Sequence, residues 1–412
     1  MKILERIKAW ALLSAEKNKS IMWLHGAAGG GKTSIARTFA NWCDSEQGIL
    51  LGEFFFSRAD GAGNHFASLA ATLAYRMAVH TLKDAKDEIL SAITQDPHIF
   101  LAPLAHQLRK LVLEPLDVLI PNGITPHVII LDGLDETLSP DEQEVVLNAV
   151  SATVCQHNST LRVLICSRAE PTIATAFNDD ESSLNTHSII LSLNNDADSD
   201  SDIRRFLVER FAKIKKQLPY RQKKEWPTSD NIDYLVKKSS GQFIFAATVE
   251  KYVGSPHHKH LAVTRLKHIL DLSLIQDPTK SPFADLDALY SLILSTRSDD
   301  KLSARAMAVC IQYSEYFGVI SPPKLAKVLR LDIDELWAIL YELGSLLDAG
   351  EDYIRPFHAS FSDFLYSESR SHNLCCEKQD IAADIASSVL GTVTFRREGT
   401  KLSYAMSHEL EH

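Results

Sequence analysis

The stretch IMWLHGAAGGGKTSIARTFA, residues 21–40, places three consecutive glycines between a short apolar run and a helical pattern. Glycine inside a helix or strand is destabilising, because its unfolded chain has the most conformational freedom to lose. A loop that wraps a phosphate must turn its backbone N–H groups inward, and glycine adopts the required conformations easily. Gly26, Gly31, Lys32 and Thr33 fill the template G-x-x-x-x-G-K-[ST]. The stretch therefore predicts a phosphate-binding loop between a strand and a helix.

The residue types of this loop predict how each would act on a phosphate chain. The amino terminus of the helix that follows adds N–H donors and a partial positive charge. We expect Lys32 to reach the β- and γ-phosphates and the Thr33 hydroxyl to bind Mg²⁺. The alternative, an ordinary glycine turn, does not account for the strand before it and the helix after it. The residues expected to contact the nucleotide are Gly26, Ala27, Ala28, Gly29, Gly30, Gly31, Lys32, Thr33 and Ser34.

A second motif, HVIILDGLDE at residues 127–136, supplies acidic residues. Its run of branched apolar residues indicates a buried parallel strand that ends at Asp132. Carboxylates at such a strand end face the crevice in which ligands bind in open α/β sheets. We expect Asp132 to hold Mg²⁺, the Walker B role, and Asp135 or Glu136 to orient or deprotonate the attacking water. The alternative is a solvated acidic turn without a catalytic role.

The stretch LRVLICSR, residues 161–168, repeats this arrangement of a buried strand followed by polar residues. Arg168 at that position is expected to sense the γ-phosphate. The alternative is a surface arginine that pairs with a nearby acid.

Short apolar runs alternate with helical patterns over the first half of the chain. The runs are apolar almost without alternation, which is typical of strands buried on both faces. Strand–helix alternation predicts an α/β fold with a five-stranded, mainly parallel sheet covered by helices on both faces. The runs span residues 21–26, 50–57, 127–134, 161–168 and 187–193.

The second half of the chain reads as mostly helical, and its later part has three helices and a small β element, the pattern of a winged helix. The expected division is an N-terminal helix at 1–20, a nucleotide-binding domain at 21–195, a helical domain at 196–298, a winged-helix domain at 299–370 and a helical tail at 371–412.

Composition limits the classes of partner. The formal net charge of -10 argues against a nucleic-acid partner, since such proteins usually present a broad basic surface. The basic stretch at residues 213–226 is interpreted as a solvated helix face and loop. No apolar run approaches the roughly 20 residues of a membrane span. Six cysteines without a C-x-x-C pair indicate reduced thiols, and we expect a cytoplasmic location.

Several of these motifs together resemble a known family. WLHGAAGGGKTSIARTFA, GEFFFSR, TLAYRMA, VIILDGLDE and RVLICSRAEP follow one another as in the NACHT nucleoside-triphosphatase domain. The sequence is similar to the fungal NLR-like group, which includes the nephrocystin-like N-terminal domain. SGQFIFAATVEKYV, LYSLIL and IRPFHASFSDFL resemble the helical and winged-helix segments that follow NACHT in that group.

The resemblance implies a STAND-type switch, a P-loop NTPase that is closed with ADP and open with ATP. It implies slow hydrolysis with Mg²⁺, nucleotide-dependent self-assembly and a role in NLR-like signalling and innate immunity. It assigns Walker A to the loop, Walker B to Asp132, Asp135 and Glu136, and a sensor to Arg168. His358 matches the winged-helix histidine that contacts the ADP phosphates in related proteins. Relatives carry effector and repeat modules, so we expect partner chains or a longer receptor.

Three readings stay open from the sequence. The first is the signalling switch, with ATP or GTP as its purine nucleotide. The second is a constitutive, motor-type P-loop ATPase. The third is a non-catalytic scaffold whose winged helix binds DNA, and the acidic balance of the chain argues against it.

Overall fold

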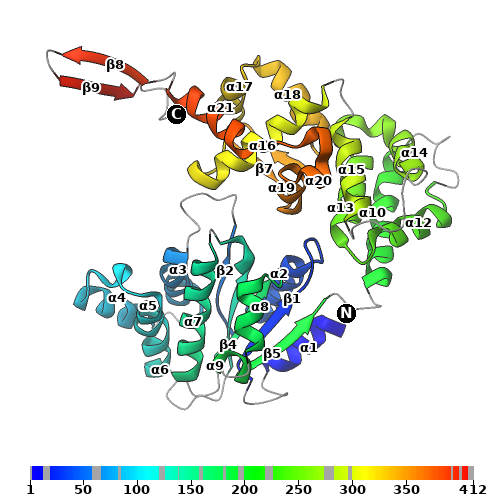
Figure 1. Ribbon diagram of the computed structural model, residues 1–412. Coiled ribbons are helices and arrows are strands. Elements are labelled where there is room, and N and C mark those ends of the chain that lie inside the picture. The colour runs from blue at the N-terminus through cyan, green and yellow to red at the C-terminus, as the bar shows by residue number, and fades with distance from the viewer. Residues whose placement is uncertain are drawn as a thin grey trace. The chain divides into compact units, whose positions relative to one another are not determined.

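The computed structural model describes residues 2–12, 19–57, 66–81, 85–119, 126–137, 139–156, 161–179, 182–193, 199–218, 226–272, 283–295, 299–390, 393–398 and 401–406. Within these residues the chain divides into an N-terminal unit that ends at Ser199 and a C-terminal unit that begins at Asp200. Figure 1 shows the elements of both units. The boundary lies close to the predicted end of the nucleotide-binding domain, and the predicted subdivision of the second half stays a prediction.

Five strands of the described residues form one sheet in the N-terminal unit, in the order β2-β3-β4-β1-β5 (Figure 1). Each neighbouring pair in it is parallel, which confirms the predicted parallel sheet. The strands are β1 Ile21–His25, β2 Leu50–Phe55, β3 His127–Asp132, β4 Leu161–Ser167 and β5 Ser188–Ser192.

Helices cover both faces of this sheet, as the continuous apolar strands require. In β1, Met22 and Leu24 pack with Phe39 on one face, and Trp23 packs with Phe177 on the other. Alternation of side chains along a strand produces the two cores. The helices of the unit are α1 Lys2–Ala11, α2 Lys32–Trp42, α3 Leu69–Arg76, α4 Ala85–Gln95, α5 Leu104–Leu108, α6 Glu114–Leu119, α7 Pro140–Gln156, α8 Pro171–Asn178 and α9 Ser183–Thr186.

The strand order determines which residues meet at the carboxyl edge of the sheet. β4 lies between β1 and β3, and Cys166 near its end pairs in register with Leu24 on one side and Asp132 on the other. The strands are parallel, so the loop after β1, the acidic turn after β3 and Arg168 after β4 leave the sheet at the same edge.

The C-terminal unit is mostly helical and is built around one hydrophobic core. An isolated bridge between Ile320 and Ile354 joins the short hairpin β6–β7 to the chain after α16. The elements are α10 Ser199–Gln217, α12 Ser229–Ser239, α13 Phe243–Val253, α14 Ala262–Asp271, α15 Ala284–Leu294, α16 Asp300–Phe317, α17 Pro322–Leu329, α18 Ile333–Glu342, β6 Leu347–Ala349, β7 Ile354–Pro356, α19 Ser360–Leu365, α20 Glu368–Ser371 and α21 Lys378–Leu390.

The end of the chain differs from the predicted helical tail. α21 is helical, but Val393–Glu398 and Lys401–Met406 then form the antiparallel strands β8 and β9. Period-2 patterning with β-branched and aromatic residues favours strands over a further helix there. Among the described helices, none has both the length and the apolar character needed to cross a membrane.

Candidate nucleotide-binding site

The glycine-rich loop lies between β1 and α2, where the sequence predicted it. Gly29 and Gly31 have φ angles of 74° and 89°, in the left-handed region that L side chains rarely adopt. A Cβ atom on Gly30 would lie 3.2 Å from the carbonyl oxygen of Ala27, closer than most side-chain contacts. The three glycines are therefore needed for different reasons, two for backbone angle and one for close approach.

Lys32 begins α2 and lies over the loop that precedes it. Its Nζ donates hydrogen bonds to the carbonyl oxygens of Gly26 at 2.8 Å and Ala27 at 3.0 Å. Burial lowers the pKa of the Lys32 ammonium, and the carboxylates of Asp135 and Asp132 act in the opposite direction. The ammonium group is thus held inside the loop by the backbone.

Asp132 ends β3 and is 4% exposed. The Thr33 side chain donates a hydrogen bond to this carboxyl group. Oδ1 of Asp132 is buried and has no hydrogen-bond partner among the described residues. Burial raises the pKa of Asp132 to about 6, against the opposing effects of Thr33 and Lys32. An unpaired buried carboxylate oxygen costs free energy, so this atom is suited to a ligand.

The acidic turn after β3 is fixed to the neighbouring strand ends. Gly133 has a φ angle of 79°, and a Cβ atom on it would lie 2.8 Å from the carbonyl oxygen of Phe56. Its N–H donates to the carbonyl oxygen of Cys166 at 2.9 Å, and the N–H of Phe56 donates to the carbonyl oxygen of Asp132 at 2.8 Å. The chain then enters a 3₁₀ turn, Leu134–Glu136, that carries the remaining acidic residues.

Asp135 is buried and binds Arg168 through both carboxylate oxygens. Oδ1 accepts a hydrogen bond from the backbone N–H of Arg168 at 2.9 Å, and Oδ2 lies 3.1 Å from its Nε. The alternative reading of Arg168, an arginine paired with an acid, describes this contact, although the pair is largely buried. Glu136 is half-buried, and its N–H donates to the carbonyl oxygen of Gly133 at 2.7 Å.

The structure brings Lys32, Thr33, Asp132, Asp135 and Arg168 together at the carboxyl edge of the sheet. Ser34 is exposed in the first turn of α2, and Ala28, within the loop itself, is buried.

Other residues at this edge were not predicted from the sequence. Trp23 Nε1 donates to Ser167 Oγ at 2.8 Å, and the His25 ring stacks on Trp23 at 4.5 Å between centroids. His25 Nδ1 is buried without a hydrogen-bond partner among the described residues, and burial together with Lys32 lowers the pKa of this imidazole. Cys166 is fully buried, and its thiol hydrogen-bonds to Asp132. The signal for His25 was a polar residue directly before the loop.

His358 belongs to the C-terminal unit and is described there by itself. Its Nδ1 accepts a hydrogen bond from the Ser360 N–H at 3.0 Å and lies 2.8 Å from Ser360 Oγ. Ser360 Oγ lies 2.9 Å from the hydroxyl oxygen of the buried Tyr290. A ring nitrogen that accepts an N–H bond carries no proton, so the neutral His358 ring has its proton on Nε2.

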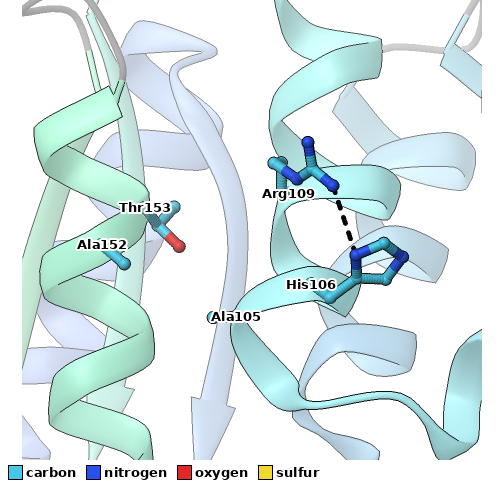
Figure 2. Close-up of a pocket in the computed structure, with 5 residues that line it drawn as sticks. All are labelled: Ala105, His106, Arg109, Ala152 and Thr153. Carbon is cyan, nitrogen blue, oxygen red and sulfur yellow. Dashed lines mark hydrogen bonds between the residues drawn. The ribbon is translucent and has the colours of Figure 1, made fainter.

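A pocket of about 210 Å³ in the N-terminal unit is lined by none of these residues. Figure 2 shows Ala105, His106 and Arg109 on one side and Ala152 and Thr153 of α7 on the other. Arg109 and His106 contact each other at 3.3 Å. Its lining lacks glycine-rich backbone and carboxylates, the features that the phosphate-binding motifs require.

The donor set at the sheet edge fits Mg²⁺. A hydroxyl group and a carboxylate with a buried, unpartnered oxygen are the hard oxygen ligands that this ion prefers. Among the described residues, no cluster of three His, Cys, Asp or Glu side chains could hold a metal by itself. Mg²⁺ usually takes one or two protein ligands together with phosphate oxygens and water, and Thr33 with Asp132 matches that pattern.

A parallel sheet with a glycine-rich loop after its first strand, a lysine and threonine at the following helix and an acidic residue at another strand end defines the P-loop NTPase fold. The N-terminal unit has this fold. Residues 2–168 match the family model described as Nephrocystin 3, N-terminal, which confirms the predicted similarity to the nephrocystin-like N-terminal domain over that part of the chain.

Comparison with curated proteins gives no match. Solved structures similar to the chain include replication initiator DnaA bound to AMPPCP and single-stranded DNA, at 12% identity and a TM-score of 0.34, covering 83% of this chain and 86% of that one. They also include Drosophila ORC bound to DNA, at 14% identity and a TM-score of 0.31, covering 98% of this chain and 92% of that one. A third is Cdc6p from Pyrobaculum aerophilum, at 12% identity and a TM-score of 0.38, covering 94% of this chain and 93% of that one. The fold class rests on the sheet and the loop.

Proposed function

We propose that the N-terminal unit binds a purine nucleoside triphosphate with Mg²⁺ and hydrolyses it slowly. The observation that carries this proposal is that Thr33 and Lys32 both interact with Asp132, whose Oδ1 is buried without a hydrogen-bond partner among the described residues. A cation, a hydroxyl group and a carboxylate placed beside a glycine-rich loop form the set that phosphoryl transfer uses.

The roles of the residues follow from their contacts. Backbone N–H groups of the loop and the first turn of α2 would bind the phosphates, and Lys32 would exchange its bonds to Gly26 and Ala27 for phosphate oxygens. Thr33 and Asp132 would hold Mg²⁺, which neutralises charge that develops on the phosphates. Glu136 is the candidate for orienting the attacking water.

We propose further that the chain is a NACHT-type STAND switch, closed with ADP and open with ATP, that assembles with copies of itself. The order α16, α17, α18 and the hairpin β6–β7 supports a winged helix that carries His358 after its second hairpin strand. In this proposal His358, with its proton on Nε2, donates to a phosphate oxygen of ADP. Effector or sensor chains and a cytoplasmic location belong to the same proposal.

The surface formed by α18 and the hairpin β6–β7 does not favour nucleic acid as a partner. α18, the third helix of the set, carries Asp334, Glu335 and Glu342 and has no lysine or arginine. The hairpin connection adds Glu351 and Asp352. Acidic groups at both elements oppose phosphate contacts, on which nucleic-acid affinity depends. A gel-shift titration with duplex and single-stranded DNA at low salt is expected to show no binding.

The direct test is to identify the nucleotide that co-purifies with the protein and to titrate ATP, ADP and GTP by calorimetry. Lys32→Ala should weaken binding by at least about 100-fold, because charge-assisted hydrogen bonds to the phosphates are lost. Lys110→Ala, in the same unit, removes a lysine that pairs with Glu114 at 2.8 Å and should leave binding unchanged. Uptake of nucleotide by Lys32→Ala at wild-type strength would overturn the proposal.

The constitutive motor-type ATPase is the second candidate, and turnover separates it from the switch. A switch retains ADP and changes its oligomeric state with ATP, as size-exclusion chromatography would detect. Steady, rapid release of ADP from a protein that stays monomeric would favour the motor-type reading.

A further inference from the structure

Asp135 and Arg168 form a two-point contact at the carboxyl edge of the sheet. One carboxylate oxygen of Asp135 accepts from the backbone N–H of Arg168, and the other lies 3.1 Å from the Nε of the same residue. Asp135 is nearly fully buried, and the Arg168 side chain is 25% exposed. A carboxylate that holds both the backbone and the side chain of an arginine restricts the rotation of that side chain.

The charges around this pair indicate what it faces. The cation of Arg168 is close enough to Lys32 to lower the pKa of the lysine, and the anion of Asp135 raises it. Two cations are therefore held near each other at the phosphate-binding loop, with Asp135 as a compensating charge. Such an arrangement favours a polyanion, since each phosphate oxygen added there gains from both cations.

A general base must reach the water whose proton it accepts. Asp135 is buried and directs both oxygens at Arg168, whereas Glu136, the next residue, is half-buried. The geometry therefore separates two residues that the sequence could not tell apart.

We propose that Asp135 is a positioning residue that fixes the Arg168 guanidinium group at the phosphate end of the site, so that Arg168 distinguishes a triphosphate from a diphosphate. The proposal rests on the nucleotide-binding function proposed above and names how that site reads the γ-phosphate. Asp135 then affects nucleotide discrimination only through Arg168, and the water is left to Glu136.

The test is a double-mutant cycle on the full chain. Affinities for ADP and for a non-hydrolysable ATP analogue, each with Mg²⁺, are measured for wild type, Asp135→Asn, Arg168→Ala and the double variant. Asp135→Asn keeps an acceptor for the Arg168 N–H but removes the charge opposite Nε. It should reduce the preference for the triphosphate by about tenfold, a typical coupling between states. In the Arg168→Ala background, the same change should have no further effect.

Hydrolysis provides the second readout. Glu136→Gln should slow turnover in both the wild-type and the Arg168→Ala background, whereas Asp135→Asn should slow it only where Arg168 is present. An effect of Asp135→Asn that persists at full size without Arg168 would overturn the proposal and return Asp135 to a direct role in catalysis. An unchanged triphosphate preference in Asp135→Asn would overturn it as well.

A measurement without nucleotide separates this inference from the proposed function. In protein labelled with ¹⁵N-arginine, the Nε–H of Arg168 should be protected from solvent exchange, and Asp135→Asn should remove that protection. Asp135→Glu, which keeps the charge on a longer side chain, serves if the asparagine variant does not fold. Unprotected Nε–H in wild type would overturn the positioning claim, whereas failure of wild type to bind nucleotide would overturn the proposed function.

Discussion

Two buried charged clusters, one in each unit, differ in how completely their groups are paired. In the N-terminal unit, Asp132 has a buried oxygen without a hydrogen-bond partner in the part of the chain that the structure describes, and burial raises its pKa to about 6. In the C-terminal unit, Arg265 donates to the carbonyl oxygen of Tyr252 at 2.9 Å and to Glu342 at 3.2 Å. The guanidinium group of Arg265 is paired with protein groups, whereas Asp132 keeps an unpaired oxygen that suits a ligand.

Burial of charge alone therefore does not identify a site. Arg265 is only 3% exposed, yet its contacts with Tyr252 and Glu342 join α14, α13 and α18 into one body. Removing one partner of a buried pair of this kind leaves a buried charge without compensation, which strongly destabilises the folded protein. The incomplete cluster at the sheet edge is the one that points to chemistry.

The largest effect is expected from breaking the completed cluster. Glu342→Ala leaves Arg265 buried without its anion and should lower the free energy of unfolding by about 4 kcal/mol. Urea denaturation of the full chain measures this change. Glu315→Ala is the matched control, because Glu315 pairs with the exposed Lys378 at 3.6 Å and should cost less than about 1 kcal/mol. Equal losses in the two variants would contradict the comparison.

The sequence predicted those parts of the site that depend on local spacing. The loop with Lys32 and Thr33 follows from a fixed template, and Asp132 follows from the end of a single apolar run. The strand order could not be predicted, because it depends on which strands pack beside each other over more than a hundred residues. The Asp135–Arg168 contact follows from that order and from the turn at Gly133, so the sequence left Asp135 and Glu136 equivalent.

Longer-range contacts were also outside the reach of local patterns. Tyr290 contacts Ser360 although they are 70 residues apart, and nothing in either segment indicates the other. In the same way, His258 Nε2 lies 3.1 Å from Glu342, a residue far along the chain. The strands β8 and β9 were missed for a different reason, because the preceding helical pattern was extended too far.

The turn at Gly133 tests whether the acidic residues after β3 are held rigidly against the neighbouring strand. Gly133→Ala places a side chain at a φ angle of 79° and 2.8 Å from the carbonyl oxygen of Phe56. Backbone strain and the steric conflict together should lower the free energy of unfolding by about 3 kcal/mol. Gly48→Ala is the control, since its φ angle is 65° but a Cβ atom there would meet nothing within 4 Å.

Gly48→Ala should therefore show the strain of the backbone alone, about 1 kcal/mol. Denaturant unfolding of both variants separates strain from steric conflict. A loss at Gly133 no larger than the loss at Gly48 would show that the turn can move away from Phe56, and that the acidic turn is not fixed to the strand ends.

The smallest change tests the incomplete cluster directly. Asp132→Asn removes the buried charge, so without nucleotide the variant should be more stable than wild type by about 2 kcal/mol at pH 7.5. The pKa of Asp132 is about 6 in the folded protein, above its ordinary value of 3.8, so the folded state binds this proton more tightly than the unfolded state. Protonation of Asp132 therefore contributes to the free energy of unfolding in full below pH 3.8, and this contribution is lost as the pH rises through about 6.

The difference in free energy of unfolding between Asp132→Asn and wild type should therefore increase from pH 4.5 to pH 7.5. Urea denaturation at a series of pH values would detect this increase. Mg²⁺ with ATP should then stabilise wild type but not Asp132→Asn, since only the wild type has the carboxylate for the ion. A variant that is less stable than wild type at pH 7.5 without nucleotide would mean that Asp132 is already satisfied by the protein. In that case the carboxyl group of Asp132 would be paired within the protein, like the guanidinium group of Arg265, and would have no oxygen left for a ligand.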